Sequence, residues 1–203
     1  GDEARLAVAM ANSTYANSGM NGQRLKFAGF RSTYCGYDED NGPYSQALID
    51  FANPATCIGA RAANLRNSNS ADMVALVRKS GGGACGVSYF APVPGNPDSA
   101  FSLTSRNCIP GHTFTYELGR NFGLERDRGS SRALGTRQAE YNFGIVLPNE
   151  ATPIRSVMSS NSACAAVGQN CIRVPLLTNM RAGNDWGGVR LGRGLWQSDP
   201  ALN

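Results

Sequence analysis

The chain lacks several features that would assign it to a class at once. No apolar run approaches the roughly 20 residues that a membrane-spanning helix needs, and the 203 residues include a single histidine. The formal net charge is only +4, which is too small to indicate nucleic-acid binding by itself. No Cys-x-x-Cys pair is present, so the usual zinc-finger spacing is excluded. We therefore expect neither a membrane nor a nucleic acid as a partner.

The length suits one domain with a sizeable core. Charged residues make up 17% of the chain and glycine occurs 24 times, which favours a loop-rich fold over a helical bundle. Neither internal repeats nor a low-complexity linker can be recognised. Apolar patterns are regular up to a helix that ends near residue 123 and irregular after it. We expect a single domain, 1–203, with an N-terminal lobe, 1–123, a C-terminal lobe, 124–203, and a cleft between them.

The six cysteines predict disulfides rather than a metal site, because their number is even and zinc-site spacing is missing. They are Cys35, Cys57, Cys85, Cys108, Cys164 and Cys171. Six cysteines allow 15 connectivities; the pairs closest in sequence are Cys85–Cys108 and Cys164–Cys171, which leaves Cys35–Cys57. Disulfides imply an oxidising compartment, so we expect a secreted protein. Its start shows no basic-then-apolar signal segment, so in a secreted protein we expect Gly1 to be either a processed end or the start of a trimmed sequence.

Hydrophobic periodicity and turn residues predict a mixture of helices and strands. The expected helices cover residues 3–17, 43–51, 59–65 and 112–122. The expected strands cover residues 23–31, 72–77, 85–90 and 100–105. This order predicts an α/β (α+β) fold in which the N-terminal lobe holds a twisted mixed sheet.

Residues 112–127, HTFTYELGRNFGLERD, resemble the zinc-binding signature of metzincin proteases. In that signature, a helix carries His-Glu-x-x-His, so two histidines lie on one face and reach one metal. A glycine then turns the chain so that a third histidine can reach the metal. Glu117 and Gly123 occupy the matching Glu and Gly positions. The three ligand positions are held by Tyr116, Arg120 and Arg126.

The resemblance extends over nearly the whole chain, in particular to bacterial peptidyl-Asp metallopeptidases and reprolysin-like secreted proteases. Asp127 closes the signature, and the stretch Ser156-Val157-Met158-Ser159 resembles the Met-turn that places a methionine under the metal. The stretches 4–20 and 158–179 resemble the same proteins. The family normally has a β-strand before the first helix, whereas this chain begins almost at that helix. The resemblance therefore implies a metzincin-like fold. Three explanations of the missing first strand stay open: an upstream chain supplies it, the chain closes its sheet differently, or the sequence starts late.

The substitutions predict that zinc is absent, because an arginine keeps its proton in a protein and cannot bind zinc. His112 lies one turn before Tyr116 and is expected to be a surface or capping residue rather than a ligand. Glu117, which the resemblance makes the general base, is expected to pair with Arg120 or Arg126 and to be idle. Met158 is expected to pack in the core.

Three functions remain open at this stage. The first is a pseudoprotease that has lost catalysis and binds a peptide or an anionic ligand in its cleft. The second is a metal-independent enzyme of lyase or glycoside hydrolase type that uses Tyr116, Glu117 and Arg120 as acid, base and anion holder. The third is a metalloprotease with an atypical metal site, whose ligands come partly from another chain. Fold analogy alone does not choose between them.

Overall fold

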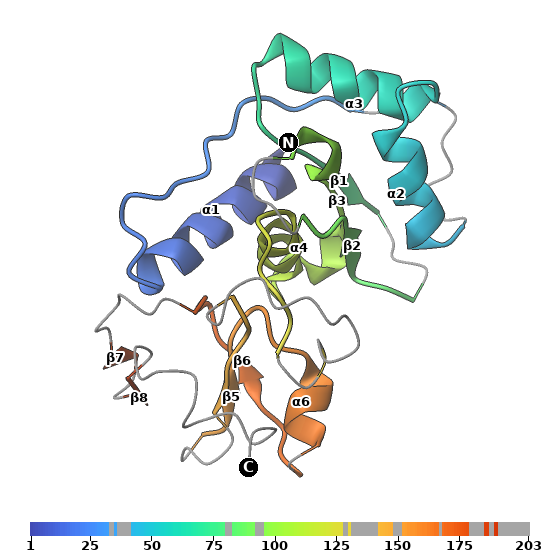
Figure 1. Cartoon of the computed structure of the whole chain (residues 1–203). Helices are drawn as coiled ribbons and strands as arrows, with labels where there is room; N and C mark the ends of the chain where they lie inside the picture. Colours follow the sequence, from blue (N-terminus) through green and yellow to red (C-terminus); the bar gives the residue numbers. More distant parts are fainter. Residues whose placement is uncertain are drawn as a thin grey trace. The chain divides into compact units, whose positions relative to one another are not determined.

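The computed structural model shows a mixed α+β protein (Figure 1). It describes residues 1–32, 35, 42–79, 83–91, 96–127, 130, 142–147, 152–166, 168–178, 185–186 and 189–190. The chain divides into two compact units. The first consists of Gly1–Met10 and Leu25–Gly123, and the second of Ala11–Arg24 and Leu124–Asn203. Helix α1 (Asp2–Asn17) contributes residues to both units.

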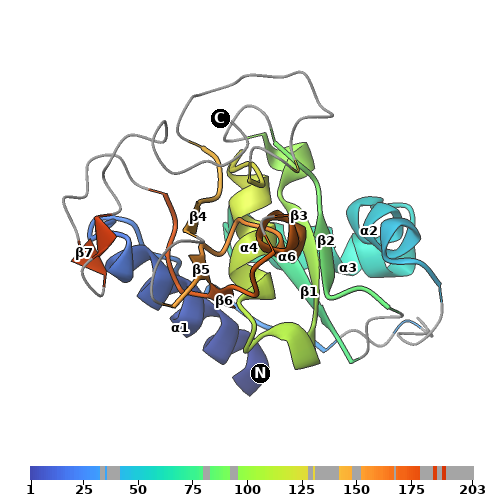
Figure 2. The same cartoon turned by 90° about the horizontal axis from the view of Figure 1, so that it is seen from below.

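A three-stranded mixed sheet forms the centre of the first unit. Its strands are β1 (Val74–Arg78), β2 (Gly86–Ser88) and β3 (Phe101–Ser105), in the order β1-β3-β2. β3 pairs with β1 in parallel and with β2 in antiparallel orientation. Figure 2 shows the sheet with α2 and α3 on one side and α4 on the other.

Helices α2 (Tyr44–Ala52) and α3 (Cys57–Ser68) bury their apolar faces against β1 and β3. The core includes the rings of Phe51 and Phe101, which meet edge to face with centroids 5.8 Å apart. The sharp turn between the helices depends on Gly59, because a Cβ atom there would lie 1.9 Å from the carbonyl oxygen of Asn53. The hydroxyl of Thr56 caps α3 by accepting a hydrogen bond from the Gly59 amide.

The opposite face of the sheet carries small polar side chains. Successive strand residues point to opposite faces. Phe101 and Leu103 belong to the core formed with α2 and α3, so Ser102 and Thr104 face α4. Both are fully buried. Short 3-10 turns, η1 (Pro97–Ser99) and η2 (Arg106–Cys108), flank β3 and lead into α4 (Thr113–Asn121).

The second unit has shorter elements. Its larger sheet has the order β4-β5-β6, with β4 (Val146–Leu147), β5 (Ile154–Arg155) and β6 (Ile172–Arg173). Helix α6 (Asn161–Ala165) lies between β5 and β6 in the chain, and a hairpin of β7 (Asp185–Trp186) and β8 (Val189–Arg190) follows. The Ser18 hydroxyl accepts a hydrogen bond from the Leu177 amide at 2.7 Å, which joins the segment after α1 to the segment after β6.

The structure confirms the disulfide prediction in full. The three bonds are Cys35–Cys57, Cys85–Cys108 and Cys164–Cys171. Among the described residues, none of the helices combines the length and the apolar character that crossing a membrane would require.

The predicted strand 23–31 is wrong, since this stretch forms no strand and runs as open chain (Figure 1). Its alternation is nevertheless visible, because Leu25 and Phe27 are half-buried between exposed neighbours. Phe27 lies under the Arg5 guanidinium, 4.7 Å from ring centroid to Cζ. The alternation thus reflects side-chain contacts, whereas a strand also needs a neighbouring strand to pair with.

Candidate functional site

Helix α4 carries the residues of the signature-like stretch in the first unit. It starts directly after His112, which adopts a left-handed conformation with φ of 61° and whose side chain does not cap the helix. Gly123 follows the helix with φ of 82°, a conformation that favours glycine, and its amide donates to the Arg120 carbonyl. Gly123 therefore ends the helix, as the sequence predicts.

Asn121 fixes the last turn of α4 to the sheet. Its side-chain amide donates hydrogen bonds to the carbonyl oxygens of Tyr89, Ser99 and Phe101, at 3.0, 2.6 and 3.1 Å. The amide of Ala91 adds a bond to the Arg120 carbonyl at 3.2 Å. The position of α4 against β2 and β3 is thus set by backbone and amide groups of the signature stretch.

Glu117 is buried, with 4% of its surface exposed, and contacts β2. The Ser88 hydroxyl donates a hydrogen bond of 2.6 Å to Oε2 of Glu117. A Cβ atom on Gly86 would lie 2.7 Å from Oε1 of Glu117, so only a glycine allows this approach. The carboxylate at the general-base position therefore packs against the edge strand of the sheet.

Tyr116 and Arg120, the two residues of α4 that the sequence analysis aligns with ligand positions, differ in burial. Tyr116 is half-buried, and Arg120 is buried with its guanidinium over the ring of Phe90, 4.1 Å from the centroid. Such stacking suits the flat, charged guanidinium group. The expected pairing of Glu117 with Arg120 or Arg126 stays a prediction.

A second buried arginine of the first unit lies against a tyrosine of α2. Arg78, the last residue of β1, is buried, and its Cζ lies 4.7 Å from the centroid of the Tyr44 ring. The pKa of Tyr44 is raised, mainly because the phenol is buried. The charge of Arg78 and a hydrogen bond with Ser105 lower this pKa, and the charge of Glu117 raises it. The charges of Arg78 and Glu117 therefore both affect the pKa of the Tyr44 phenol.

In the second unit, Asp127 is a buried acceptor for two backbone amides. Its Oδ1 accepts from Ser130 and its Oδ2 from Ser160, both at 2.9 Å. Burial lowers the pKa of Arg155, and the charge of Asp127 opposes that effect. Arg126, one residue earlier, is exposed. Asp127 thus has a structural role that the sequence analysis did not assign.

The stretch around Met158 forms a tightly held turn. The Ser159 amide donates to the Ser156 carbonyl at 3.1 Å, and Met158 has 1% of its surface exposed. Both serine hydroxyls bond to the backbone of Ile145, with Ser156 accepting from its amide and Ser159 donating to its carbonyl. Gly144 lets the two segments approach, because a Cβ atom there would lie 2.6 Å from the Ser159 amide nitrogen. Met158 packs in the interior of the second unit, as the sequence predicts.

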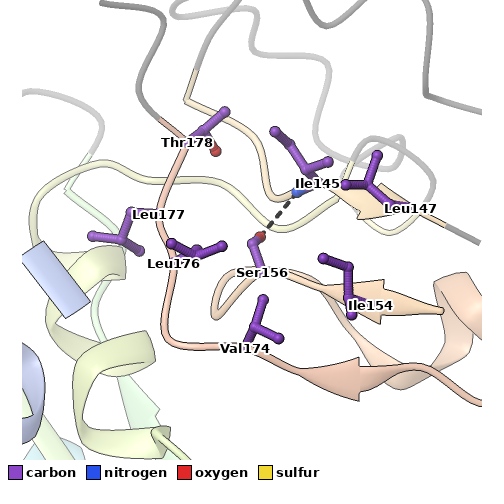
Figure 3. Close-up of a pocket in the computed structure, with 8 residues that line it drawn as sticks. All are labelled: Ile145, Leu147, Ile154, Ser156, Val174, Leu176, Leu177 and Thr178. Atoms are coloured by element: carbon purple, nitrogen blue, oxygen red, sulfur yellow. Dashed lines mark hydrogen bonds between the residues drawn. The ribbon is translucent and has the colours of Figure 1, made fainter. Parts of the chain in front are cut away.

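An apolar pocket lies beside this turn (Figure 3). Its cavity volume is about 10 Å³, roughly the space of one water molecule, and most of its lining is aliphatic. The lining residues are Ile145, Leu147, Ile154, Ser156, Val174, Leu176, Leu177 and Thr178. Ser156 and Thr178 each have a backbone partner within the unit, at Ile145 and Phe143. The pocket is therefore a small apolar gap in the packing of the second unit, without room for a ligand.

The structure brings Tyr116, Glu117 and Arg120 together on α4, as the sequence predicts, and assigns Arg126, Asp127 and Met158 to the second unit. Sequence reasoning missed Ser88 and Gly86, which contact Glu117, and the buried pair of Arg78 and Tyr44 in the same unit. One signal was available, since Arg78 ends the apolar run of the predicted strand 72–77 and an arginine is unusual in a buried strand.

The described residues include no group of three or more His, Cys, Asp or Glu side chains that could hold a metal ion. All six cysteines are in disulfides. The side chains that occupy the ligand positions of the signature are a phenol and two guanidiniums, which do not match the nitrogen, sulfur and carboxylate donors of catalytic zinc.

Comparisons with known proteins bear on the fold alone. No protein-family model and no curated protein match the chain. Three chains of solved structures match. One of them, from "Structure of a chaperone-substrate complex", has a TM-score of 0.58 and 18% sequence identity, over 97% of this chain and 28% of that chain. The chain thus spans little more than a quarter of the matched one, and at this identity the likeness shows a shared fold.

Proposed function

We propose that this protein is a secreted, metzincin-like pseudoprotease that acts by binding rather than by cleavage. The observation that carries the proposal is the set of side chains at the three ligand positions, Tyr116, Arg120 and Arg126. Arg120 is buried and stacked on Phe90, so its group is engaged in packing. The three disulfides support an oxidising, extracellular location.

The chemistry of these side chains supports the loss of proteolysis. A guanidinium stays protonated and offers donors only, so it repels a cation instead of binding it. Without a metal, no acidified water is available to the carboxylate at position 117. The ligand that we propose is a peptide or another group with an anionic end, because the guanidinium of the exposed Arg126 is suited to bind a carboxylate through two parallel hydrogen bonds.

Metal content and peptide cleavage, measured on the same preparation, test the proposal. The protein is purified without chelators, zinc is measured by plasma mass spectrometry, and a peptide library is used to detect cleavage. We expect no stoichiometric zinc and no cleavage. One zinc per chain together with cleavage would overturn the proposal.

A variant with restored ligands is the matched control. Tyr116→His, Arg120→His and Arg126→His together rebuild the ligand set of the signature. If the scaffold is metzincin-like, this variant gains zinc in the same assay, whereas the single change Tyr116→His does not. A folded triple variant without zinc would contradict the metzincin-like assignment of the site.

A metal-independent enzyme is the weaker candidate, because Glu117 is buried against β2 and bonded to Ser88. A metalloprotease that takes ligands from a second chain would be detected by the same metal measurement.

The sheet edge supports one further proposal, that an extended polypeptide segment pairs with the outer side of β1. The amide of Val74 bonds to the Ala100 carbonyl, and alternate residues of a strand face the same neighbour. The backbone groups of Ala75 and Val77 therefore point away from β3, and they have no strand partner within the described part of the chain. Amide hydrogen exchange tests this: rapid exchange at both residues in the isolated chain and protection in the presence of the partner are expected. Protection in the isolated chain would contradict it.

A further inference from the structure

The stretch 25–32 of the first unit has a backbone that is open to pairing (Figure 1). Within the described part of the chain, the backbone groups of residues 26–32 take part in no hydrogen bond. Residues 28–32 are all exposed, so this part of the chain lies at the surface. Half-buried Leu25 and Phe27 alternate with exposed Lys26 and Ala28, which is the pattern of an extended chain. Backbone groups without partners on an extended chain can pair with another strand.

Two contacts hold this stretch against helices of the first unit. The Phe27 ring lies under the guanidinium of Arg5 in α1, with 4.7 Å from its centroid to Cζ. Gly29 passes close to Asn69 at the end of α3, because a Cβ atom on Gly29 would lie 3.0 Å from the side-chain oxygen of Asn69. A segment that is already fixed loses less conformational freedom when a partner binds. The stretch is therefore preorganised for binding.

The exposed side chains along this stretch are cationic and aromatic. Arg5, Lys26 and Arg31 are exposed, and none of the three forms an ion pair within the described chain. Phe30 lies between two of these cations in sequence and has 53% of its surface exposed. Residues 20–32 include no acid. Aromatic residues and arginine are enriched where proteins bind one another, and a positive surface favours a negative partner.

We propose that residues 26–32 form a docking site for an acidic, extended polypeptide segment, which adds to them as a β-strand. Main-chain hydrogen bonds to the open backbone hold the partner, as in other complexes that form by strand addition. Acidic side chains of the partner lie beside Lys26 and Arg31, and an apolar side chain covers Phe30. The docking site depends neither on the proposed loss of cleavage nor on pairing at β1, so each can fail separately.

Binding of a defined peptide tests the docking site. The probe is a fluorescein-labelled peptide of alternating glutamate and valine, and fluorescence anisotropy measures its dissociation constant. We expect binding at low ionic strength that weakens as salt is added, because salt screens exposed charges. Amide hydrogen exchange at alternate residues between 28 and 32 should slow by about tenfold or more in the complex. Absence of binding, or binding without slower exchange, would overturn the proposal.

A peptide with methylated backbone nitrogens separates strand pairing from charge attraction. It has the same sequence and charge as the probe, but it cannot donate main-chain hydrogen bonds. We expect it to bind at least about tenfold more weakly than the probe, because strand addition draws its affinity from these bonds. Equal affinity of the two peptides would show attraction by charge alone and would contradict the proposal.

Lys26→Gln and Lys79→Gln are matched variants of the protein. They replace the only two lysines of the chain, both of which are exposed, and each removes one positive charge. Lys26→Gln should weaken binding of the probe by about two- to fivefold, the range of one cross-strand charge pair, and Lys79→Gln should leave it unchanged. Equal losses in the two variants would overturn the placement of the site. Zinc content enters none of these measurements, so they are independent of the test of the pseudoprotease proposal.

Discussion

The phenol of Tyr15 predicts a specific loss of stability at alkaline pH. Tyr15 lies near the end of α1, in the part that belongs to the second unit, and has 7% of its surface exposed. Its hydroxyl has no hydrogen-bond partner among the described residues. Burial raises the pKa of Tyr15 from 10.0 to about 12, because the charged phenolate is poorly solvated inside the protein.

The direction of the effect follows from the raised pKa. Below pH 10, the phenol is protonated in both the folded and the unfolded chain, so stability does not depend on it. Between pH 10 and 12, the unfolded chain loses the proton while the folded chain keeps it, and the free energy of unfolding falls. Each unit of pKa difference corresponds to 1.36 kcal/mol, so the full loss above pH 12 is about 2.7 kcal/mol, of which about 2 kcal/mol is reached at pH 11.5.

Urea denaturation at several pH values between 9 and 11.5, on the original protein and Tyr15→Phe, measures this loss. The substitution removes a buried hydroxyl without a described partner and should be nearly neutral at pH 9. At pH 11.5, the variant should be more stable than the original by about 2 kcal/mol. Other tyrosines titrate in both proteins and cancel in the difference. Parallel stability curves over this pH range would refute the reasoning.

Three further substitutions test contacts described above, each by urea denaturation. Gly144→Ala should lower the free energy of unfolding by about 2 kcal/mol, because its Cβ would overlap Ser159; Gly22→Ala, where a Cβ meets nothing, is the control. Asp127→Ala should cost about 2 to 3 kcal/mol, because it leaves two backbone amides without their charged acceptor, and Asp127→Asn should cost less. Thr104→Val should stabilise by up to about 1 kcal/mol, because the buried Thr104 hydroxyl has no partner in the described structure; a loss of stability instead would contradict this.

Elements with strong local signals could be predicted from the sequence. α2 starts at Tyr44 directly after Pro43, α3 begins at a threonine cap, and α4 ends at a glycine with positive φ. These are features of a few neighbouring residues, so no knowledge of the tertiary structure is needed. The disulfides were predictable for a related reason, since each joins cysteines that are adjacent among the six along the chain.

Features that depend on distant partners could not be predicted in the same way. The stretch 23–31 has the alternation of a strand but no strand beside it, and the two-residue strands β4, β5 and β6 exist only through mutual pairing. The same applies to the site. The helix that carries Glu117 could be predicted from the sequence. The hydrogen-bond partner of the Glu117 carboxylate could not, because Ser88 lies 29 residues earlier in the chain. Tyr44, whose pKa is raised by the charge of Glu117, lies still further away in sequence.

The signature-like stretch contains residues that stabilise the fold and residues at the positions that would bind a metal. Asn121 binds three carbonyl oxygens, Gly123 adopts a positive φ after α4, and Asp127 accepts two backbone amides. Each of these roles is internal to the fold and needs no metal. The positions that would carry chemistry are the ones that hold a phenol and two guanidiniums. A match to the scaffold residues of such a motif is therefore informative about the fold, whereas function follows only from the side chains at the ligand positions. For this reason, the triple histidine variant changes only the ligand positions. It tests whether the rest of the stretch can still hold a metal.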